Sequence, residues 1–293
     1  MTQAPQGAQD DRTERRVRLA DGRSLGYSEY GDPNGAPIVY FHGGASSRLD
    51  IAFADDQCRR MGARIISIDR PGMGLSEYKP GRTILDWPDD VGYLLSALHV
   101  DRCAVLGWSG ATPYVLACAL RLPDRVSRAA TVGGMSPIDA PGALKELAFR
   151  PDRILFRLAR KAPQAACILL SVSALMPPAL IHYHLLGQLP EPDRRVMESL
   201  APREATAFYF EALREGPKGV VRDYQLIGKP WRIPHADSPT EVHLWRGEHD
   251  LVPSSHTTWL AGRLARSEII EVPSQGHFLL HTNLDQVLEK LVA

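Results

Sequence analysis

The sequence is poor in several features that would point to particular classes of protein. Basic and acidic side chains balance at 34 each, so the formal net charge is +0 and no overall basic field exists to attract nucleic acid. Only 4 cysteines occur in 293 residues, without the spacing of a metal site, which fits a reducing compartment. The longest apolar stretch, Ala165 to Met176, is about half of the ~20 residues that span a bilayer, and two prolines follow it.

The first residues also lack the pattern of a secretory signal. Met1 to Arg16 is polar and charged, without an apolar core. We therefore expect residues 1–15 to be a flexible tail and the protein to be cytoplasmic. The remaining chain, with an overall hydrophobic content of 44%, is long enough for one large α/β domain plus an inserted element.

Apolar runs alternate with helical patterns over most of the chain. This alternation predicts an α/β fold, in which a mostly parallel sheet is covered by helices on both faces. Strands are expected at Arg16–Leu19, Ser24–Tyr30, Pro37–Phe41, Arg64–Ile68, Cys103–Leu106, Ser127–Val132, Glu241–Trp245 and Ser267–Val272. Helices are expected at Arg48–Met61, Ile84–Leu98, Pro113–Leu122, Thr257–Leu264 and Leu284–Leu291.

The strand pattern disappears between Pro137 and Pro234. We expect this part, residues 137–234, to be a helical cap inserted into a core formed by residues 16–136 and 235–293. Helical spacing covers Gly142–Ala162, Pro163–Met176, Asp193–Leu200 and Glu204–Arg214. Arg150, Arg153, Arg157 and Arg160 form one basic face, which we interpret as solvated rather than as an anion or membrane contact. The apolar run from Ala165 to Val172 fits either a pocket lining or the core of the cap.

A candidate nucleophile lies at the end of a predicted strand. Ser109 stands between the apolar run that ends at Leu106 and a helical pattern that begins at Pro113. A serine at such a sharp turn needs small residues two positions before and after it, and Gly107 and Ala111 satisfy this. The free N–H groups at the start of the helix favour negative charge beside the hydroxyl.

A glycine-rich turn follows an earlier strand. The sequence His42-Gly43-Gly44 comes directly after Ile38–Phe41. A backbone without side chains can approach a substrate closely and offer N–H donors, as one arm of an oxyanion hole requires. We interpret His42 as a residue that braces neighbouring loops and not as a catalytic group.

A carboxylate and a histidine follow the last two predicted strands. Asp250 lies in the turn after Gly247, and Glu248 is the rival carboxylate. His277 follows the strand that ends at Val272, and its ring could reach Ser109. His281 and His256 compete with His277, although His281 lies one helical turn deeper and is more typical of a packing residue.

The chain order Ser109, Asp250, His277 resembles that of the α/β-hydrolase superfamily. Leu19–Tyr27 resembles the entry hairpin of that family. Ile68–Ser76 resembles the loop after the next strand, and we interpret its Pro71, Gly72 and Gly74 as turn-forming. The resemblance covers nearly the whole chain. It implies a lid over the active site, formed by the cap.

On this basis we expect a serine hydrolase that cleaves a carboxylic ester or related acyl compound through an acyl-enzyme. Ser109 would attack, His277 would act as base, Asp250 would orient it, and the Gly44 and Gly110 N–H groups would stabilise the oxyanion. We expect a small-molecule acyl substrate, no metal or organic cofactor, no nucleic acid and no transmembrane segment, with the oligomeric state open.

The serine narrows the resemblance. Haloalkane dehalogenase-like and epoxide hydrolase-like members use an aspartate at the turn, so Ser109 argues against both. Trp108 precedes the serine rather than following it as in proline iminopeptidases, and Ala45 stands where hormone-sensitive-lipase-like enzymes have a third glycine. The same triad would also serve a carbon–carbon bond, lactone or thioester hydrolase or a cofactor-free perhydrolase. A non-catalytic small-molecule receptor is the alternative from another class.

Overall fold

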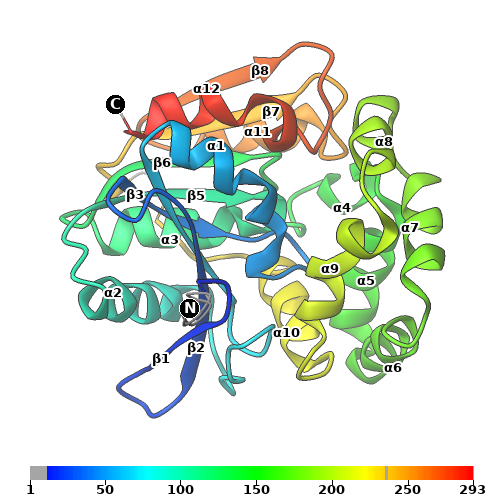
Figure 1. The fold of residues 1–293 in the computed structure, drawn as a ribbon. Helices are drawn as coiled ribbons and strands as arrows, with labels where there is room; N and C mark the ends of the chain where they lie inside the picture. The colour runs from blue at the N-terminus through cyan, green and yellow to red at the C-terminus, as the bar shows by residue number, and fades with distance from the viewer. Residues whose placement is uncertain (1–11, 235–236, 293) are drawn as a thin grey trace, which may run out of the picture.

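A twisted sheet forms the centre of the molecule. The computed structural model describes residues 12–234 and 237–292, and its sheet has the strand order β1-β2-β4-β3-β5-β6-β7-β8 (Figure 1). Residues 1–11 of the expected tail lie outside the described residues. The strands are β1 Arg15–Arg18, β2 Ser24–Gly31, β3 Ala36–Phe41, β4 Ala63–Ile68, β5 Cys103–Trp108, β6 Val126–Val132, β7 Val242–Gly247 and β8 Ser267–Val272.

The sheet is mostly parallel, as the sequence predicts. β1 pairs antiparallel with β2, and β2 antiparallel with β4, whereas every pair from β4 to β8 is parallel. Strand β3 shows why the central strands read as unbroken apolar runs. Ile38 and Tyr40 belong to the core on one face of the sheet, and Val39 and Phe41 to the core on the other.

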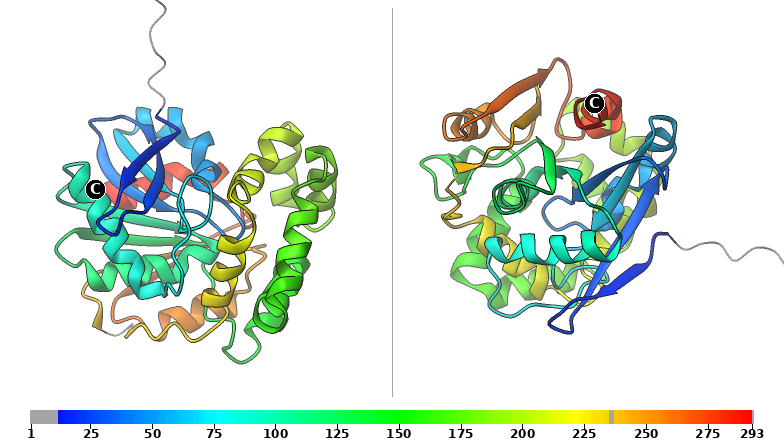
Figure 2. Two further views of the ribbon diagram at one scale, coloured as in Figure 1. Left: turned by 90° about the horizontal axis from the view of Figure 1, so that it is seen from below. Right: turned by 90° about the vertical axis from the view of Figure 1, so that its left-hand side faces the viewer.

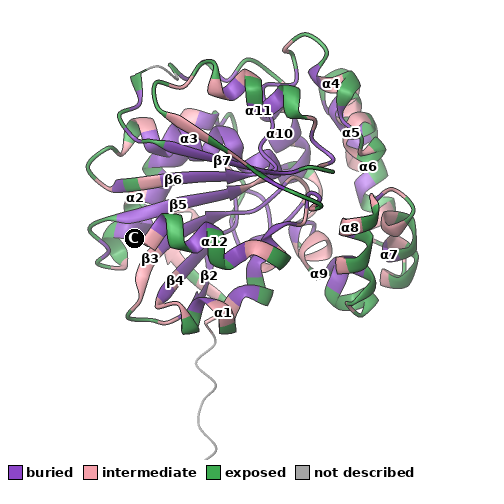
Figure 3. Cartoon of the chain, turned by 90° about the horizontal axis from the view of Figure 1, so that it is seen from above, coloured by how far each residue is buried: buried purple, intermediate pink, exposed green. Residues whose placement is uncertain are grey.

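Helices cover both faces of the sheet (Figure 2). The core on one face includes residues of α2, α3 and α11, and the core on the other includes residues of α1 and α12. Figure 3 shows the buried strands between these partly exposed helices. The helical segments outside the cap are η1 Arg48–Ala54, α1 Asp55–Arg60, η2 Ile84–Asp86, α2 Trp87–Ala97, η3 Ser109–Ala111, α3 Thr112–Arg121, α11 Ser254–Ala261 and α12 Leu280–Val292.

The helical cap is inserted between β6 and β7 and lies at one side of the sheet (Figure 1). Its helices are α4 Ala143–Glu146, α5 Arg150–Lys161, α6 Pro163–Ser173, α7 Pro178–Leu186, α8 Glu191–Glu198, α9 Pro202–Ala212 and α10 Lys218–Ile227. Helices α7 and α10 were not predicted from the sequence. The two prolines after Met176 indicated the end of a helix, but the second of them, Pro178, begins α7. A proline fits the first turn of a helix because that turn needs no N–H from it.

Prolines divide the cap into short helices. Each helix from α5 to α9 has a proline in its first two positions. Among the described residues, no single helix is long and apolar enough to cross a membrane, although α6 and α7, bent by 113° at their junction, pass that test as a pair.

Candidate active site

Ser109 occupies the turn between β5 and α3 in a strained backbone conformation. Its φ of +55° lies in the left-handed region, which residues other than glycine rarely adopt. The turn is crowded, because a β-carbon on residue 107 would lie 2.5 Å from Val115 Cγ2 and 3.0 Å from Ala111 Cβ. This crowding explains why small residues flank Ser109 at a spacing of two. The strained turn leaves Ser109 7% exposed, at the wall of a cavity.

The glycine-rich turn after β3 lies against the Ser109 turn. A β-carbon on Gly110 would lie 3.3 Å from the Gly44 nitrogen, so the two backbones approach closely. Side chains on the turn itself would also collide: a β-carbon on residue 43 would lie 2.7 Å from the Trp108 ring, and one on residue 44 would lie 2.8 Å from the Tyr224 hydroxyl. Within the described part of the chain, the Gly44 N–H donates no hydrogen bond to another protein group. It is therefore available to a ligand.

A buried arginine fixes the orientation of this N–H group. Arg70 donates to the His42 carbonyl at 2.5 Å and to the Gly43 carbonyl at 2.7 Å. The Gly43 carbonyl and the Gly44 N–H belong to one planar trans peptide unit and point in opposite directions. Because Arg70 holds the carbonyl, the N–H points away from Arg70. The charge of Arg70 is balanced by Asp223 of α10, at 2.9 Å, and both side chains are fully buried.

His277 and Asp250 form a buried pair. The Nδ1 atom of His277 lies 2.6 Å from Asp250 Oδ1, which also accepts a hydrogen bond from the Val252 N–H at 2.8 Å. A carboxylate can only accept, so Nδ1 carries the hydrogen and Nε2 is left free as an acceptor. Gly133 makes room for the pair, since a β-carbon there would lie 2.5 Å from His277 Nδ1.

The surroundings of His277 raise its pKa above the ordinary value of 6.5. Burial is the largest single effect and opposes this by disfavouring the charged ring, but the charge and hydrogen bond of Asp250 together with the charges of Asp193 and Asp152 outweigh burial. Three carboxylates therefore favour the protonated imidazole, the form that a general base reaches after it has taken a proton.

The cap holds the backbone of the His277 loop. Asp193, on α8, is 1% exposed, and its two carboxylate oxygens accept hydrogen bonds from the His277 N–H at 2.9 Å and the Phe278 N–H at 2.8 Å. On the core side, the indole N–H of Trp108 donates to the His277 carbonyl at 3.0 Å. The residue before Ser109 and a cap carboxylate thus position the same histidine.

The rival candidates lie elsewhere. The Glu248 carboxylate accepts from the Ser274 N–H at 2.9 Å and is exposed. His256 is buried, and its Nδ1 accepts from the Ser136 N–H at 3.1 Å. His281 stacks on Phe53 of η1, with ring centroids 3.7 Å apart. His281 is therefore a packing residue, as expected. Its partner is η1 and not the last helix, because His281 itself belongs to that helix.

His42 braces loops, in the manner that the sequence analysis expected. It is fully buried, and its Nε2 accepts from the Arg70 N–H at 3.2 Å. Burial, with the nearby positive charge of Arg70, lowers its pKa well below 6.5, so the ring is neutral and can accept this hydrogen bond.

A cavity of about 690 Å³ joins these groups to the cap. Its lining includes Gly44, Ser109 and His277 from the core, together with many apolar side chains from the cap. Two polar groups lie near the Gly44 turn: the Tyr224 hydroxyl donates to Asp152 Oδ1 at 2.5 Å. Among the described residues, no cluster of three His, Cys, Asp or Glu side chains is arranged to hold a metal ion.

Sequence reasoning missed the buried supports of the site. Arg70 was interpreted as part of a turn and Asp193 as the first residue of a helical segment, whereas Asp223 lay outside every predicted element. Asp193 follows a proline near the start of α8, where acidic residues are common, so its local sequence carries no other signal. The pairing of Arg70 with Asp223 joins residues 153 positions apart, which no local pattern reveals.

Comparison with known proteins agrees with this geometry. A family model of the alpha/beta hydrolase fold matches residues 36–172. An sn-1-specific diacylglycerol lipase ABHD11 of Danio rerio is 28% identical over 118 residues, which is 40% of this chain and 37% of that protein. A non-heme chloroperoxidase of Streptomyces lividans is 30% identical over 130 residues, 42% of this chain and 45% of that protein. The matched segments thus span less than half the length of these two relatives.

The solved structures share the fold along the whole chain. A structure from a study of carboxylesterases of Nitrososphaera gargenis has a TM-score of 0.69 and 16% identity, covering 94% of this chain and 95% of that one. The matched family model describes the same fold as the strand order and the inserted helices of this structure. The chain therefore has the α/β-hydrolase fold.

Proposed function

We propose that this protein is a serine hydrolase that cleaves a carboxylic ester or a related acyl compound through an acyl-enzyme intermediate. The observation that carries the proposal is the strained Ser109, at φ +55°, on the same cavity wall as Gly44 and as His277, whose ring is paired with Asp250. A serine with positive φ costs free energy and persists only where the surrounding structure imposes it. Such strained residues cluster at active sites.

In the proposed reaction the Ser109 hydroxyl attacks the substrate carbonyl while His277 Nε2 takes its proton. Asp250 keeps the hydrogen on Nδ1 and stabilises the imidazolium that forms. The protonated ring then donates to the leaving alcohol, and a water molecule activated by the same ring releases the acid. The raised pKa of His277 supports this role, because it makes the ring a better base.

The negative charge on the tetrahedral intermediate would be held by the N–H groups of Gly44 and Gly110. Their close approach supports this role, as does the hydrogen bond that Arg70 donates to the Gly43 carbonyl. That hydrogen bond draws electrons from the Gly43–Gly44 peptide unit, which strengthens Gly44 N–H as a donor. The cap carboxylate Asp223 keeps the arginine in place.

The apolar lining of the cavity favours an acyl compound with a hydrocarbon part. Leu155, Leu170, Ile181, Leu185 and Leu189 all contribute to this lining. The similarity to a diacylglycerol lipase accords with such a substrate. The similarity to a non-heme chloroperoxidase keeps perhydrolysis on the same residues as the second candidate, in which hydrogen peroxide replaces water in the second step.

Labelling with a fluorophosphonate followed by intact-protein mass spectrometry tests the nucleophile. We expect one equivalent of label on the wild type, located on Ser109, and none on Ser109→Ala. Turnover of p-nitrophenyl esters of increasing chain length separates an enzyme from a receptor. Stoichiometric labelling of Ser109→Ala, or a labelled wild type that turns over no ester, lactone or thioester, would contradict the proposal.

A further inference from the structure

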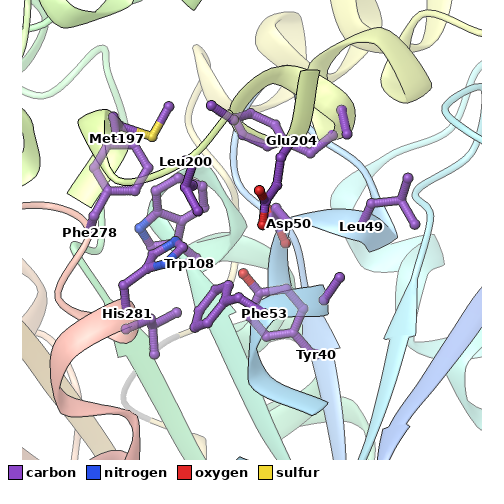
Figure 4. Close-up of a pocket in the computed structure, with 15 residues that line it drawn as sticks. Tyr40, Leu49, Asp50, Phe53, Trp108, Met197, Leu200, Glu204, Phe278 and His281 are labelled. Carbon is purple, nitrogen blue, oxygen red and sulfur yellow. The ribbon is translucent and has the colours of Figure 1, made fainter. Parts of the chain in front are cut away.

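A second cavity, of about 300 Å³, lies behind Trp108 at the junction of core and cap (Figure 4). Its walls come from η1, from Tyr40 of β3, from α8 and α9 of the cap, and from the start of α12. It shares Trp108, Met197, Phe208 and Phe278 with the cavity of about 690 Å³ at Ser109, called the catalytic cavity below, so these four side chains form the partition. The volume is at the lower end of the ~300–1,000 Å³ of small-molecule sites.

The second cavity is aromatic and carries only negative charge. The ring-bearing side chains in its walls are Tyr40, Phe53, Trp108, Phe208, Phe278 and His281. Asp50 and Glu204 are its acidic residues, and no lysine or arginine lines it. Burial lowers the pKa of His281 to about 4, so this ring is uncharged at neutral pH.

Asp50 contributes a buried carboxylate to the wall of this cavity. The residue is 9% exposed, and its Oδ2 accepts from the Gly43 N–H at 3.0 Å and the Ser46 hydroxyl at 2.7 Å. Burial raises the pKa of Asp50 to about 6, although hydrogen bonds from the Gly43 N–H, the Ser46 hydroxyl and the Tyr40 hydroxyl act in the opposite direction. These donors do not fully compensate the carboxylate for its burial, so a cation beside it would favour its charged form.

We propose that this second cavity binds a small organic ammonium ion. An N–H of the ammonium group would donate to the Asp50 carboxylate, and its carbon substituent would lie against the rings of Phe53 and Trp108. Rings attract a cation through their negative faces, and the absence of a lysine or arginine in the lining leaves the charge of the carboxylates for the ligand. A neutral ligand of the same shape would gain neither interaction.

Two sources could supply this ammonium group. It could be a separate amine that occupies only the second cavity, or a cationic part of a substrate whose ester lies at Ser109. Both use the same chemistry at Asp50. The second case rests on the proposed function, whereas the first requires no catalysis by this protein.

Isothermal titration calorimetry with 2-phenylethylammonium and with 2-phenylethanol tests the site in the full-length protein. We expect one ammonium ion per chain and an affinity at least tenfold above that of the alcohol. Asp50→Asn keeps an oxygen that can accept from the Gly43 N–H but removes the charge, so ammonium binding should weaken at least tenfold. Glu248→Gln, which removes a carboxylate far along the rim, should bind like the wild type.

A second variant guards against loss of folding in Asp50→Asn. Ala207 lines the second cavity from the exposed face of α9, so Ala207→Trp should fill the space and prevent ammonium binding. Equal affinities for the ammonium ion and the alcohol, or ammonium binding that survives Ala207→Trp in a folded protein, would overturn the proposal. The same titration of Ser109→Ala should give the wild-type affinity for the ammonium ion, because binding at equilibrium requires no catalysis. The result therefore does not depend on whether the protein is a hydrolase.

A pair of esters distinguishes the two sources. One carries an ammonium group in its alcohol part, and the other a neutral group of the same shape. If the ammonium belongs to the substrate, Asp50→Asn lowers the ratio of kcat/KM for the cationic over the neutral ester at least tenfold. If the ammonium is a separate molecule, this ratio stays unchanged while the calorimetric affinity falls.

Discussion

The core and the cap differ in how they use polar groups. In the core, the polar groups around Ser109 are buried and held by hydrogen bonds, as the pairing of His277 with Asp250 shows. The cap, in contrast, has most of the exposed large hydrophobic side chains of the described chain, among them Leu175 at 86% and Ile168 at 65% exposed. Its contribution to the catalytic cavity is mainly apolar.

Two buried carboxylates are the exceptions in the cap, and both reach the core. Asp193 holds the loop of His277, and Asp223 holds Arg70 beneath the Gly43–Gly44 turn. The cap therefore does two separate things. Its apolar helices line the cavity at Ser109, whereas α8 holds the His277 loop and α10 holds Arg70. The variants below separate these two contributions, beginning with the core.

The largest effect should come from Asp250 in the core. Asp250→Asn can no longer hold the hydrogen on His277 Nδ1, so we expect kcat to fall by roughly 10³ or more. Ester turnover measures this loss. Glu248→Gln is the matched control, because that exposed carboxylate accepts a hydrogen bond from the Ser274 N–H and not from His277, and it should keep near-normal turnover. A larger loss in Glu248→Gln would transfer the role to that residue.

The next largest effect should come from Asp223 of the cap. Asp223→Asn leaves Arg70 and Arg82 buried without their carboxylate, and removal of one partner from a buried ion pair costs about 3–5 kcal/mol. Urea unfolding measures this change. Glu198→Gln on the exposed side of α8 is the control and should alter stability by less than about 0.5 kcal/mol. Similar stabilities for the two variants would show that the cap is not anchored through this pair.

Asp193 should affect catalysis more than stability. Asp193→Asn has only one good acceptor for the two N–H groups of the His277 loop, so the ring loses part of its alignment with Ser109. We expect kcat to fall roughly tenfold with KM for a small ester little changed, because misplacement of a catalytic group slows the chemical step. An unchanged kcat in a folded variant would limit Asp193 to a structural role.

Most of the fold could be predicted from the sequence because its signals are local. Strand β3 is an unbroken apolar run, and Ser109 lies between two small residues at a strand end. The cap was less predictable. Prolines both end and begin its helices. Pro178 was therefore compatible with either the end of one helix or the start of the next, and α7 was missed. Helix α10 was missed as well, and its buried face includes the polar Asp223, which breaks the apolar pattern.

The candidate site divides in the same way. Ser109, Asp250, His277 and Gly44 each follow a strand that the sequence predicts, and parallel strands bring their ends to one rim. Arg70 and Asp193 instead act through contacts between distant parts of the chain. A single sequence carries no signal for such contacts, since a buried ion pair looks like two ordinary charged residues until the fold joins them.

The pH dependence of kcat/KM reports the pKa of His277, which carboxylates of both the core and the cap raise. Because the unprotonated ring is the base and its pKa is raised above 6.5, kcat/KM should rise with pH through a midpoint above 6.5 and then level off. Asp152, in the cap, is one of the carboxylates that raise this pKa. Asp152→Asn should therefore shift the midpoint to lower pH, whereas His281→Ala should leave it in place. A midpoint well below 6.5 in the wild type, or its loss in His281→Ala, would contradict the assignment of the base.

The smallest effect should come from the apolar helices of the cap. Leu170 of α6 is buried and lines the catalytic cavity, whereas Leu175 just beyond α6 is exposed and does not line it. Leu170→Ala enlarges the cavity, so the preference among p-nitrophenyl esters should move toward longer chains by a few fold. This corresponds to about 1 kcal/mol, the low end of what one methylene contributes in an apolar pocket. Labelling of Ser109 by a small fluorophosphonate should keep its rate, because α6 makes none of the hydrogen bonds that position His277 or the Gly44 turn. Leu175→Ala is the matched control and should change neither property. If Leu170→Ala slows labelling in proportion to ester turnover while the protein stays folded, then α6 also positions the core residues, and the two contributions of the cap are not separable.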